Sequence, residues 1–240
     1  MTDELARMDR PMFNSQRPKD LRLARPWHRF AYLIRRLPQL IGWLAPVLEV
    51  PAHGRVLDYG CAELPYRYLF DPSVEYVGAD LPGNPDASLE LRANGSVPVA
   101  DATFDAVVST QVLEHVGDPG LYLSECYRVL RPGGRLLLTT HGVFFYHPDP
   151  VDYWRWTSAG LQRIVEQAGF EVITLEGIVG LMATGIHLVN DAVYSTMPPP
   201  VRTPISLVLQ FLMRVVDRVF DSNEGRRQNA LVFGLVARKP

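Results

Sequence analysis

The residues best suited to chemistry lie in two short segments, each at the end of an apolar run. Asp58, Gly60 and Ala62 form an acid-x-small-x-small turn, and Gly60 can adopt a positive φ or let a ligand approach the backbone closely. Asp80 follows Asp58 by 22 residues. This spacing is typical of a βαβ unit in which the acid after the second strand binds ribose hydroxyls. The pattern predicts a cofactor site, with plain strand-end turns as the alternative.

The elements that must position these residues alternate between strands and helices. A helix could follow the first turn and point its N-terminal N–H groups at a ligand. Apolar residues recur at helical spacing over residues 27–48, and Pro38 and Pro46 should divide this stretch into two short helices. Further helices are expected at residues 119–130 and 158–168, and strands at residues 54–58, 76–80, 88–91, 104–109, 135–140, 170–175 and 231–238.

This alternation predicts an α/β fold, a mostly parallel sheet with both faces covered by helices. The chain has 240 residues, 47% of them apolar, which fits one large domain. We expect residues 1–25 to form a flexible basic arm and residues 26–240 a single domain. Within that domain, residues 141–157 should form a substrate loop, and residues 178–229 a helical cap inserted before the last strand.

Composition and charge argue against several classes of protein. The net charge is −2 and the pI about 6.3, so we expect no nucleic-acid partner. The first 36 residues hold nine Arg/Lys and four Asp/Glu, which indicates a solvated tail or, alternatively, a contact for an anionic surface or substrate. Two cysteines are too few for a disulfide framework or a zinc site. With no secretory signal or 18-residue apolar stretch in the sequence, we expect a cytoplasmic protein without a membrane span.

Several sequence motifs occur in the order and at the spacing of one known family. They are Val56-Leu57-Asp58-x-Gly60-Cys61, Tyr76-x-Gly78-x-Asp80, Phe104-Asp105-x-Val107-Val108-Ser109, and Glu114-His115-Val116 followed by Arg128-Val129-Leu130-Arg131-Pro132-Gly133-Gly134. With them the chain resembles the class I S-adenosylmethionine-dependent methyltransferases, and within these the small-molecule subgroup with an L-E-H-V signature. The resemblance covers about residues 50–175 and a final strand. It implies a Rossmann-like sheet in the order 3-2-1-4-5-7-6, with strand 7 antiparallel.

The resemblance also implies that S-adenosylmethionine is the cofactor and assigns residues around it. Asp58 matches the acid that organises the first loop and the methionine ammonium group, and Asp80 matches the acid that binds the ribose. Asn94-Gly95 stands where the family often has an acid near the adenine amino group. The other matching positions are Gly60, Cys61 and Ala62 in the first loop, Leu81 beside the adenine, and Thr110 and Gln111 at the methionine end.

The first loop departs from the family pattern at two positions. The second and third glycines of the pattern are Ala62 and Leu64 here, and Pro65 follows. Ala62 leaves room for a ligand because its side chain is small, whereas Leu64-Pro65 stiffens the turn and could shift the start of a following helix. A catalytically weak, cofactor-binding interaction module is therefore the alternative to an enzyme. Because Asp58 and Asp80 are both present, we favour the enzyme.

Methyl transfer requires an aligned acceptor and, for a hydroxyl, a base that removes its proton. Histidine is the usual base, and the candidates are His141, at the carboxyl edge of the sheet, and His115, within the subgroup signature. Each could instead only shape the pocket. We expect O-methylation of a hydroxyl on a sugar, glycolipid or natural-product scaffold, with N- or C-methylation of a small molecule as the alternative. Gln111 stands where similar metal-dependent enzymes carry an acid, so no metal is expected.

Residues 152–157, which are dense in aromatic and hydrogen-bonding side chains, are expected to contact the small-molecule acceptor. Tyr153, Trp154 and Arg155 are the candidate substrate-binding residues of this segment, and His147 is a candidate at the rim of the pocket. The alternative is that the tryptophans pack the following helix onto the sheet.

An amphipathic helix is predicted at residues 205–220. Its polar residues form one narrow stripe, so the wide apolar face must be buried against a partner surface. We favour a lid over the pocket or a homodimer contact over a peripheral membrane contact, because interfacial helices usually carry more than two basic residues. The residues of the stripe are Ser206, Gln210, Arg214, Asp217, Arg218 and Asp221.

Overall fold

The computed structural model describes residues 26–148 and 151–240, so the expected basic arm at residues 1–25 lies outside the described residues. Seven strands in the described residues form one sheet in the order β3-β2-β1-β4-β5-β7-β6, which confirms the predicted order. β7 runs antiparallel to its neighbours β5 and β6, and the other pairs are parallel. The strands are β1 (Arg55–Tyr59), β2 (Glu75–Asp80), β3 (Leu89–Glu90), β4 (Phe104–Thr110), β5 (Leu130–His141), β6 (Glu171–Gly180) and β7 (Ala230–Arg238).

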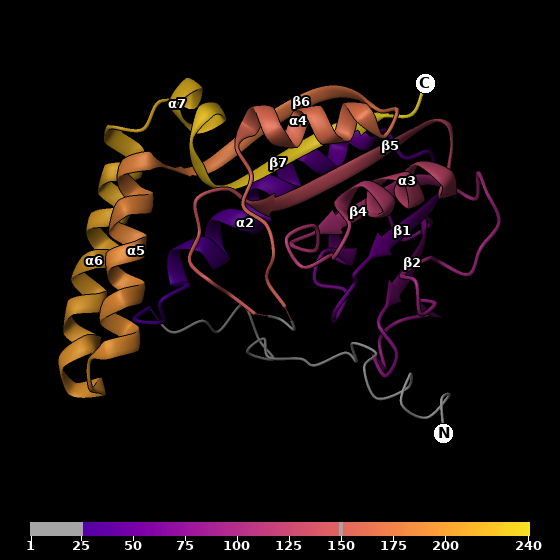
Figure 1. The fold of residues 1–240 in the computed structure, drawn as a ribbon. Coiled ribbons are helices and arrows are strands. Elements are labelled where there is room, and N and C mark those ends of the chain that lie inside the picture. The colour runs from indigo at the N-terminus through magenta and orange to yellow at the C-terminus, as the bar shows by residue number, and fades with distance from the viewer. Residues whose placement is uncertain (1–25, 149–150) are drawn as a thin grey trace.

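Helices cover both faces of the sheet, which gives the domain three layers (Figure 1). They are α2 (Ala31–Leu44), α3 (Pro119–Val129), α4 (Ser158–Gln167), α5 (Leu181–Thr196), α6 (Pro199–Val219) and α7 (Asn223–Gln228), with 3-10 turns η2 (Ala45–Leu48) and η3 (Arg67–Leu69). On one face, Ile41 and Leu44 of α2 share a buried core with Val56 of β1. On the other face, Leu123 of α3 and Leu161 of α4 share a second core. Strand residues therefore point into two cores, as expected of a parallel sheet.

The prediction that Pro38 divides the first helical stretch is wrong. A single helix, α2, continues through Pro38, and η2 follows it. Leu33, Leu40 and Ile41, which lie on both sides of the proline, belong to the same buried core. Burial of these side chains offsets the backbone hydrogen bond that a proline removes from a helix.

The helix expected after β1 is also absent, because the helical element between β1 and β2 is the short 3-10 turn η3. The cause lies in the local sequence. Leu64 adopts a φ of 52°, and Pro65 disfavours the helical conformation for the residue that precedes it. No α-helix N-terminus in this described segment is therefore directed at the first loop.

The segment between β6 and β7 forms a helical hairpin, α5 and α6, that stands beside the sheet (Figure 1). On α6, residues of the predicted polar stripe face inward, and the wide apolar face lies on the outside. Ser206, Gln210 and Asp217 are buried, whereas Val208 and Phe211 are 58% and 63% exposed. In the described residues, no helix is both long and apolar enough to cross a membrane.

Hydrogen bonds explain why the polar stripe of α6 faces inward. The Ser206 hydroxyl donates to Oδ1 of Asn190 on α5, at 2.6 Å. The Gln210 side chain accepts a hydrogen bond from the backbone nitrogen of Tyr32, at 3.1 Å, and donates to the carbonyl oxygen of His28, at 2.9 Å. Buried polar groups need such partners, and α2 and α5 supply them. The apolar residues of α6 are left on the outside.

Candidate active site

A cavity of about 1080 Å³ opens along the carboxyl ends of β1, β2, β4 and β5. Its walls come from the loops after these strands, from α3 and from the N-terminal part of α2. The carboxyl edge is where open α/β sheets bind their ligands. Three of the expected cofactor residues, Asp58, Cys61 and Thr110, are buried outside the lining of the cavity. The expected cofactor residues that do line it are Gly60, Ala62, Asp80, Leu81, Asn94, Gly95 and Gln111.

The loop after β1 keeps a glycine-type backbone although two of its residues are not glycine. Gly60 has a φ of +81°, and a Cβ atom there would lie 2.4 Å from Cγ2 of Val112. Ala62 and Leu64 also have positive φ values, of 45° and 52°. Such values are strained for residues with a Cβ atom. The loop therefore retains the backbone course of a glycine-rich turn at a conformational cost.

Asp80 secures this loop from the end of β2. Its Oδ2 atom accepts hydrogen bonds from the backbone nitrogen of Ala62 and from the side chain of Asn84, both at 2.8 Å. Its Oδ1 atom accepts from the backbone nitrogen of Leu81, at 2.7 Å. Sequence reasoning missed Asn84, which also donates to the carbonyl oxygen of Ala62, at 2.8 Å. An Asn four residues after a strand-end acid is a weak signal by itself.

Asp58 and Cys61 support the loop from beneath. Asp58 accepts a hydrogen bond from the hydroxyl of Tyr76, at 2.7 Å. The Cys61 side chain packs against Gly78, where a Cβ atom would lie 2.8 Å from its Sγ atom. Burial raises the pKa of the Cys61 thiol, which keeps the group neutral. The thiol is therefore a packing group beneath the cavity.

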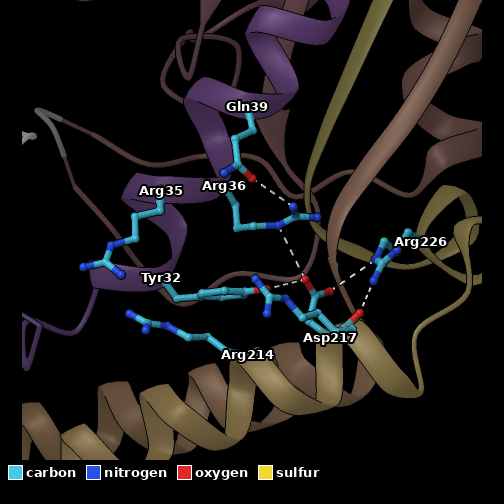
Figure 2. Close-up of a pocket in the computed structure, with 8 residues that line it drawn as sticks. Tyr32, Arg35, Arg36, Gln39, Arg214, Asp217 and Arg226 are labelled. Carbon is cyan, nitrogen blue, oxygen red and sulfur yellow. Dashed lines mark hydrogen bonds and ion pairs between the residues drawn. The ribbon is translucent and has the colours of Figure 1, made fainter.

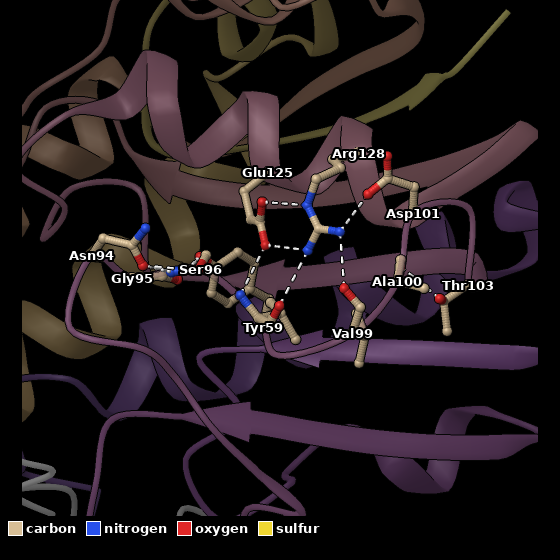
Figure 3. A network of polar contacts seen from close by, with 11 residues as sticks. Tyr59, Asn94, Gly95, Ser96, Val99, Ala100, Asp101, Thr103, Glu125 and Arg128 are labelled. Atoms are coloured by element: carbon tan, nitrogen blue, oxygen red, sulfur yellow. Dashed lines mark hydrogen bonds and ion pairs between the residues drawn. The ribbon is translucent and has the colours of Figure 1, made fainter.

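A polar network holds the loop that carries Asn94 and Gly95 (Figure 3). Nη2 of Arg128 donates to the carbonyl oxygen of Val97 at 3.1 Å, and Nη1 donates to that of Val99 at 2.9 Å. Glu125 accepts from the Arg128 guanidinium and from the backbone nitrogen of Val97, in each case at 2.7–2.8 Å. The Arg128 side chain thus fixes this loop to α3.

Glu114 is a buried acid that lies beside His115 and His141. Its Oε2 atom accepts a hydrogen bond from the Thr140 hydroxyl, at 2.8 Å. Its Oε1 atom lies 3.3 Å from Nδ1 of His141, without the alignment of a hydrogen bond, and 4.0 Å from Nε2 of His115. Burial raises the pKa of the Glu114 carboxyl. From the sequence alone, Glu114 was recognised only as part of the L-E-H-V signature.

The two candidate bases have different environments. Nδ1 of His115 lies 2.5 Å from the carbonyl oxygen of Val151. A carbonyl oxygen can only accept, so Nδ1 carries the proton and Nε2 of the neutral ring is left as an acceptor. His141 is 3% exposed and its ring stacks on Phe144 with the centroids 3.9 Å apart. Burial, followed by the nearby Arg155, lowers the pKa of His141 well below its ordinary value.

Of the expected substrate-binding residues, His147 lines the cavity, whereas Tyr153, Trp154 and Arg155 do not. Arg155 instead pairs with Asp152 and donates from Nε to the carbonyl oxygen of Phe144, at 3.0 Å. Nε1 of Trp154 donates to the carbonyl oxygen of Val116, at 2.8 Å. These residues fix the course of the loop after β5, while other residues form the wall of the cavity.

Sequence reasoning missed the aromatic part of that wall. The ring of Phe144 stacks on that of Phe145 with centroids 4.5 Å apart, and Phe30 stacks on Phe145 at 5.8 Å. Phe30, Phe144, Tyr146 and Tyr194 line the cavity. The aromatic residues 144–146 could have been predicted from the sequence, because they follow β5, which ends at the edge of the sheet that borders the cavity. Phe30 comes from a distant segment and had no such signal.

Metal binding has no structural support in the described ranges, residues 26–148 and 151–240. No group of three or more His, Cys, Asp or Glu side chains in these ranges is arranged to hold a metal ion. Gln111, which stands where similar metal-dependent enzymes carry an acid, donates from Nε2 to the hydroxyl of Thr139, at 3.1 Å.

Comparison with known proteins identifies the family. A family model described as a methyltransferase domain matches residues 27–175, which is more than half of the chain and includes the loops after β1, β2, β4 and β5. The chain belongs to this methyltransferase family. Its sheet order is that of the class I fold, and S-adenosylmethionine is the cofactor of these methyltransferases.

Relatives of this methyltransferase align over part of their length. A "probable S-adenosylmethionine-dependent methyltransferase" of Mycolicibacterium smegmatis is 39% identical over 88 residues, 34% of each chain. A "ubiquinone biosynthesis O-methyltransferase" of Dinoroseobacter shibae is 31% identical over 159 residues, 52% of this chain and 63% of the relative. The chain thus spans less than two thirds of either relative. A phosphoethanolamine N-methyltransferase of Haemonchus contortus, solved with S-adenosylmethionine, shares the fold, with a TM-score of 0.53, 19% identity, and 85% of this chain and 52% of that chain covered.

The residues at the cavity fit this cofactor. Gly60 lines the cavity with a φ of +81° and no side chain, so a ligand in the cavity can approach its backbone. Oδ2 of Asp80 accepts from Ala62, Asn84 and the Cys61 thiol, whereas Oδ1 accepts only from the backbone nitrogen of Leu81. Oδ1 therefore keeps a lone pair for a ribose hydroxyl. In this methyltransferase, Gly60 and Asp80 would therefore hold the cofactor.

Proposed function

We propose that this methyltransferase transfers a methyl group to a hydroxyl of a small, ring-bearing molecule, with His115 as the general base. When bound, S-adenosylmethionine supplies a methyl group that its sulfonium already activates. The observation that carries the proposal is the 2.5 Å contact between Nδ1 of His115 and the carbonyl oxygen of Val151. This contact fixes the tautomer in which Nε2 accepts a proton. His115 lines the cavity, so an acceptor hydroxyl can reach it.

The positions of Glu114 and His141 support this role for His115. Oε1 of Glu114 lies 4.0 Å from Nε2 of His115, so the carboxyl group stands beside the nitrogen that would take the proton. His141 is held neutral by burial and stacked on Phe144, which suits a positioning residue better than the base. We therefore assign the base to His115 and the packing of the site to His141.

The acceptor class follows from the aromatic wall. Phe30, Phe144 and Tyr146 line the cavity together with Tyr194, and flat aromatic surfaces bind rings through stacking. The printed name of the Dinoroseobacter shibae relative, an O-methyltransferase of ubiquinone biosynthesis, supports a hydroxyl on a ring as the methylated group. A natural-product ring or a sugar with an exposed hydroxyl fits both observations.

The experiment that tests this function is a product search. The purified chain is incubated with methyl-labelled S-adenosylmethionine and small-molecule extracts of the source cell, and products with one added methyl group are sought by mass spectrometry. We expect a labelled ether on a ring-bearing molecule. A label found on nitrogen or carbon would contradict the proposed O-methylation.

One observation favours a second candidate, a cofactor-binding module with little catalysis. The strained residues Ala62 and Leu64 and the missing helix after β1 weaken two of the usual supports of the cofactor loop. Calorimetry separates the candidates. Binding of S-adenosylmethionine, together with no labelled product from any extract, would support the module.

A further inference from the structure

The outward side of the α5–α6 hairpin has no partner within the described part of the chain. We call this side the outer face. On α6 it consists of Leu207, Val208, Phe211, Leu212, Val215 and Val219, which are 39–67% exposed. Such a continuous apolar patch marks an interaction surface. It does not cover the active-site cavity, because Tyr194 is the residue of the hairpin that lines that cavity.

A second cavity, of about 400 Å³, lies along one edge of α6, between α6 and α2 (Figure 2). Five arginines line it, together with Tyr32, Gln39 and Asp217, and we call it the arginine pocket. Arg36 and Arg226 point toward Asp217 (Figure 2). The arginines are Arg35, Arg36, Arg214, Arg218 and Arg226.

The one acid of the arginine pocket is already satisfied. Asp217 is 1% exposed and accepts hydrogen bonds from the Tyr32 hydroxyl, at 2.5 Å, and from Nε of Arg226, at 3.2 Å. Its Oδ2 atom also lies 3.5 Å from Nε of Arg36. Arginine stays charged at any ordinary pH, so the pocket carries four uncompensated positive charges. This excess of positive charge favours an anionic ligand.

The remaining arginines are the ones free to bind it. Arg35, Arg214 and Arg218 make no hydrogen bond or ion pair within residues 26–148 and 151–240. Figure 2 shows Arg35 on α2 and Arg214 on α6 extending in the same direction, away from Asp217. Guanidinium groups in this arrangement match phosphate oxygens.

The arginine pocket and the outer face are continuous. Leu207, Phe211, Arg214 and Arg218 follow one another at helical spacings of four, three and four residues, so they lie along one edge of α6. An apolar face bordered by arginines is the pattern of a helix that lies in a membrane interface, where arginine stems extend along apolar surface and their heads reach lipid phosphates.

The charges of the hairpin argue against a second copy as the occupant. The two acids of α5 and α6 are Asp191, which pairs with Arg29 at 2.8 Å, and the buried Asp217. A symmetric contact through the outer face would cover its apolar residues but offer no acid from these helices to Arg214 and Arg218. An anionic lipid surface satisfies both the apolar and the charged parts.

We propose that the outer face of the α5–α6 hairpin docks on an anionic phospholipid surface, with lipid phosphates held in the arginine pocket. The docked hairpin is also the element that contributes Tyr194 of α5 to the lining of the large cavity. The inference stands on surface residues that take no part in the proposed methyl transfer.

Vesicle co-sedimentation of the full chain tests the proposal. We expect binding to vesicles of phosphatidylcholine with phosphatidylglycerol, little binding to phosphatidylcholine alone, and a decrease with salt. Replacing Arg214 and Arg218 with Gln should weaken binding by at least about tenfold. The matched control replaces Arg92 and Arg163, two exposed arginines of other elements, with Gln, and should retain binding.

A second pair of variants tests the contribution of the outer face's apolar residues to vesicle binding. Val208→Ser combined with Phe211→Ser should weaken vesicle binding by at least about tenfold, while Tyr68→Ser, at a residue 62% exposed on η3, should not. Both changes are at exposed side chains, so unchanged circular dichroism is expected.

Three outcomes would overturn the proposal. Equal binding to both kinds of vesicle would show that the arginine pocket does not bind lipid phosphates selectively, which contradicts the proposal. A dimer in solution that Val208→Ser with Phe211→Ser dissociates, without vesicle binding, would assign the outer face to a second copy. Calorimetric binding of inorganic phosphate without vesicle binding would make the pocket a site for a free anion.

Discussion

Oδ2 of Asp80 lies 2.8 Å from the backbone nitrogen of Ala62, so the acid at the end of β2 closes the loop at the end of β1. Asp80 ends β2, and Ala62 lies in the loop after the neighbouring parallel strand β1, so their contact sets the course of that loop along the cavity. The loop conformation depends on this carboxylate, and we propose that cofactor binding depends on it as well.

Asp80→Asn should weaken the binding of S-adenosylmethionine. The change replaces one acceptor oxygen by a donor, so a hydrogen bond from Ala62, Leu81 or the ribose is lost, at a cost of about 1–3 kcal/mol. Calorimetry should report a Kd about tenfold to a hundredfold higher. Asp86→Asn, at an exposed residue nearby, is the control. An unchanged Kd for Asp80→Asn would remove Asp80 from the cofactor site.

Ala62→Gly should stabilise the protein, because glycine adopts a φ of 45° without strain. We expect a gain of about 0.5–1 kcal/mol in the free energy of unfolding, measured by denaturant titration. Ala192→Gly, the same change at an exposed position of α5, should lose about 0.5–1 kcal/mol. Loss of stability in both variants would show that the loop is unstrained.

The sheet was predictable from sequence because buried strands leave strong local signals. The run Phe104-Asp105-Ala106-Val107-Val108-Ser109 identified β4, and four motifs in order gave the strand sequence and the sheet order. Pro38 misled because tertiary packing of Leu40 and Ile41 keeps α2 continuous, and no local pattern reports packing. The cavity-lining positions were found where they lie in strand-end loops, as for Gly60 and Asp80.

The orientation of α6 could not be predicted, for a different reason. An amphipathic pattern shows that two faces differ but not which one a domain covers. Here the covered face is polar, because Asn190 of α5 and Tyr32 of α2 offer partners to Ser206 and Gln210. Those partners are 16 and 178 residues away in the chain.

The stability of the protein should fall in acid because His187 is buried. Burial, together with nearby Arg29, lowers its pKa to about 4, and its ring nitrogens have no hydrogen-bond partner in the described residues. Between pH 6.5 and 4 the unfolded chain binds a proton that the folded chain does not. The free energy of unfolding should therefore decrease as pH falls through this window, by up to about 1.4 kcal/mol per pH unit from this group.

The variant His187→Leu isolates this contribution. Its free energy of unfolding should depend less steeply on pH between 6.5 and 4 than that of the wild type, while His53→Asn, at an exposed histidine, should keep the wild-type slope. Identical slopes for His187→Leu and the wild type would show that His187 titrates normally in the folded protein.

Arg128→Met should loosen the loop at residues 94–101. The change removes the hydrogen bonds to the carbonyl oxygens of Val97 and Val99 and leaves Glu125 without its arginine. We expect faster amide hydrogen exchange over residues 94–101 and a Kd for S-adenosylmethionine about tenfold higher. Arg163→Met, at an exposed residue of α4, is the control. Unchanged exchange in Arg128→Met would show that other contacts hold this loop.

The assignment of His115 as the base is tested most directly by turnover of His115→Gln with methyl-labelled S-adenosylmethionine and the acceptor from the product search. A base acts in the transition state, so kcat should fall by about 10²–10⁴ while the Kd for S-adenosylmethionine stays at its wild-type value. His147→Gln, at another histidine of the cavity, should keep most of the turnover. Wild-type turnover in His115→Gln, or an equal loss in cofactor binding, would contradict the assignment.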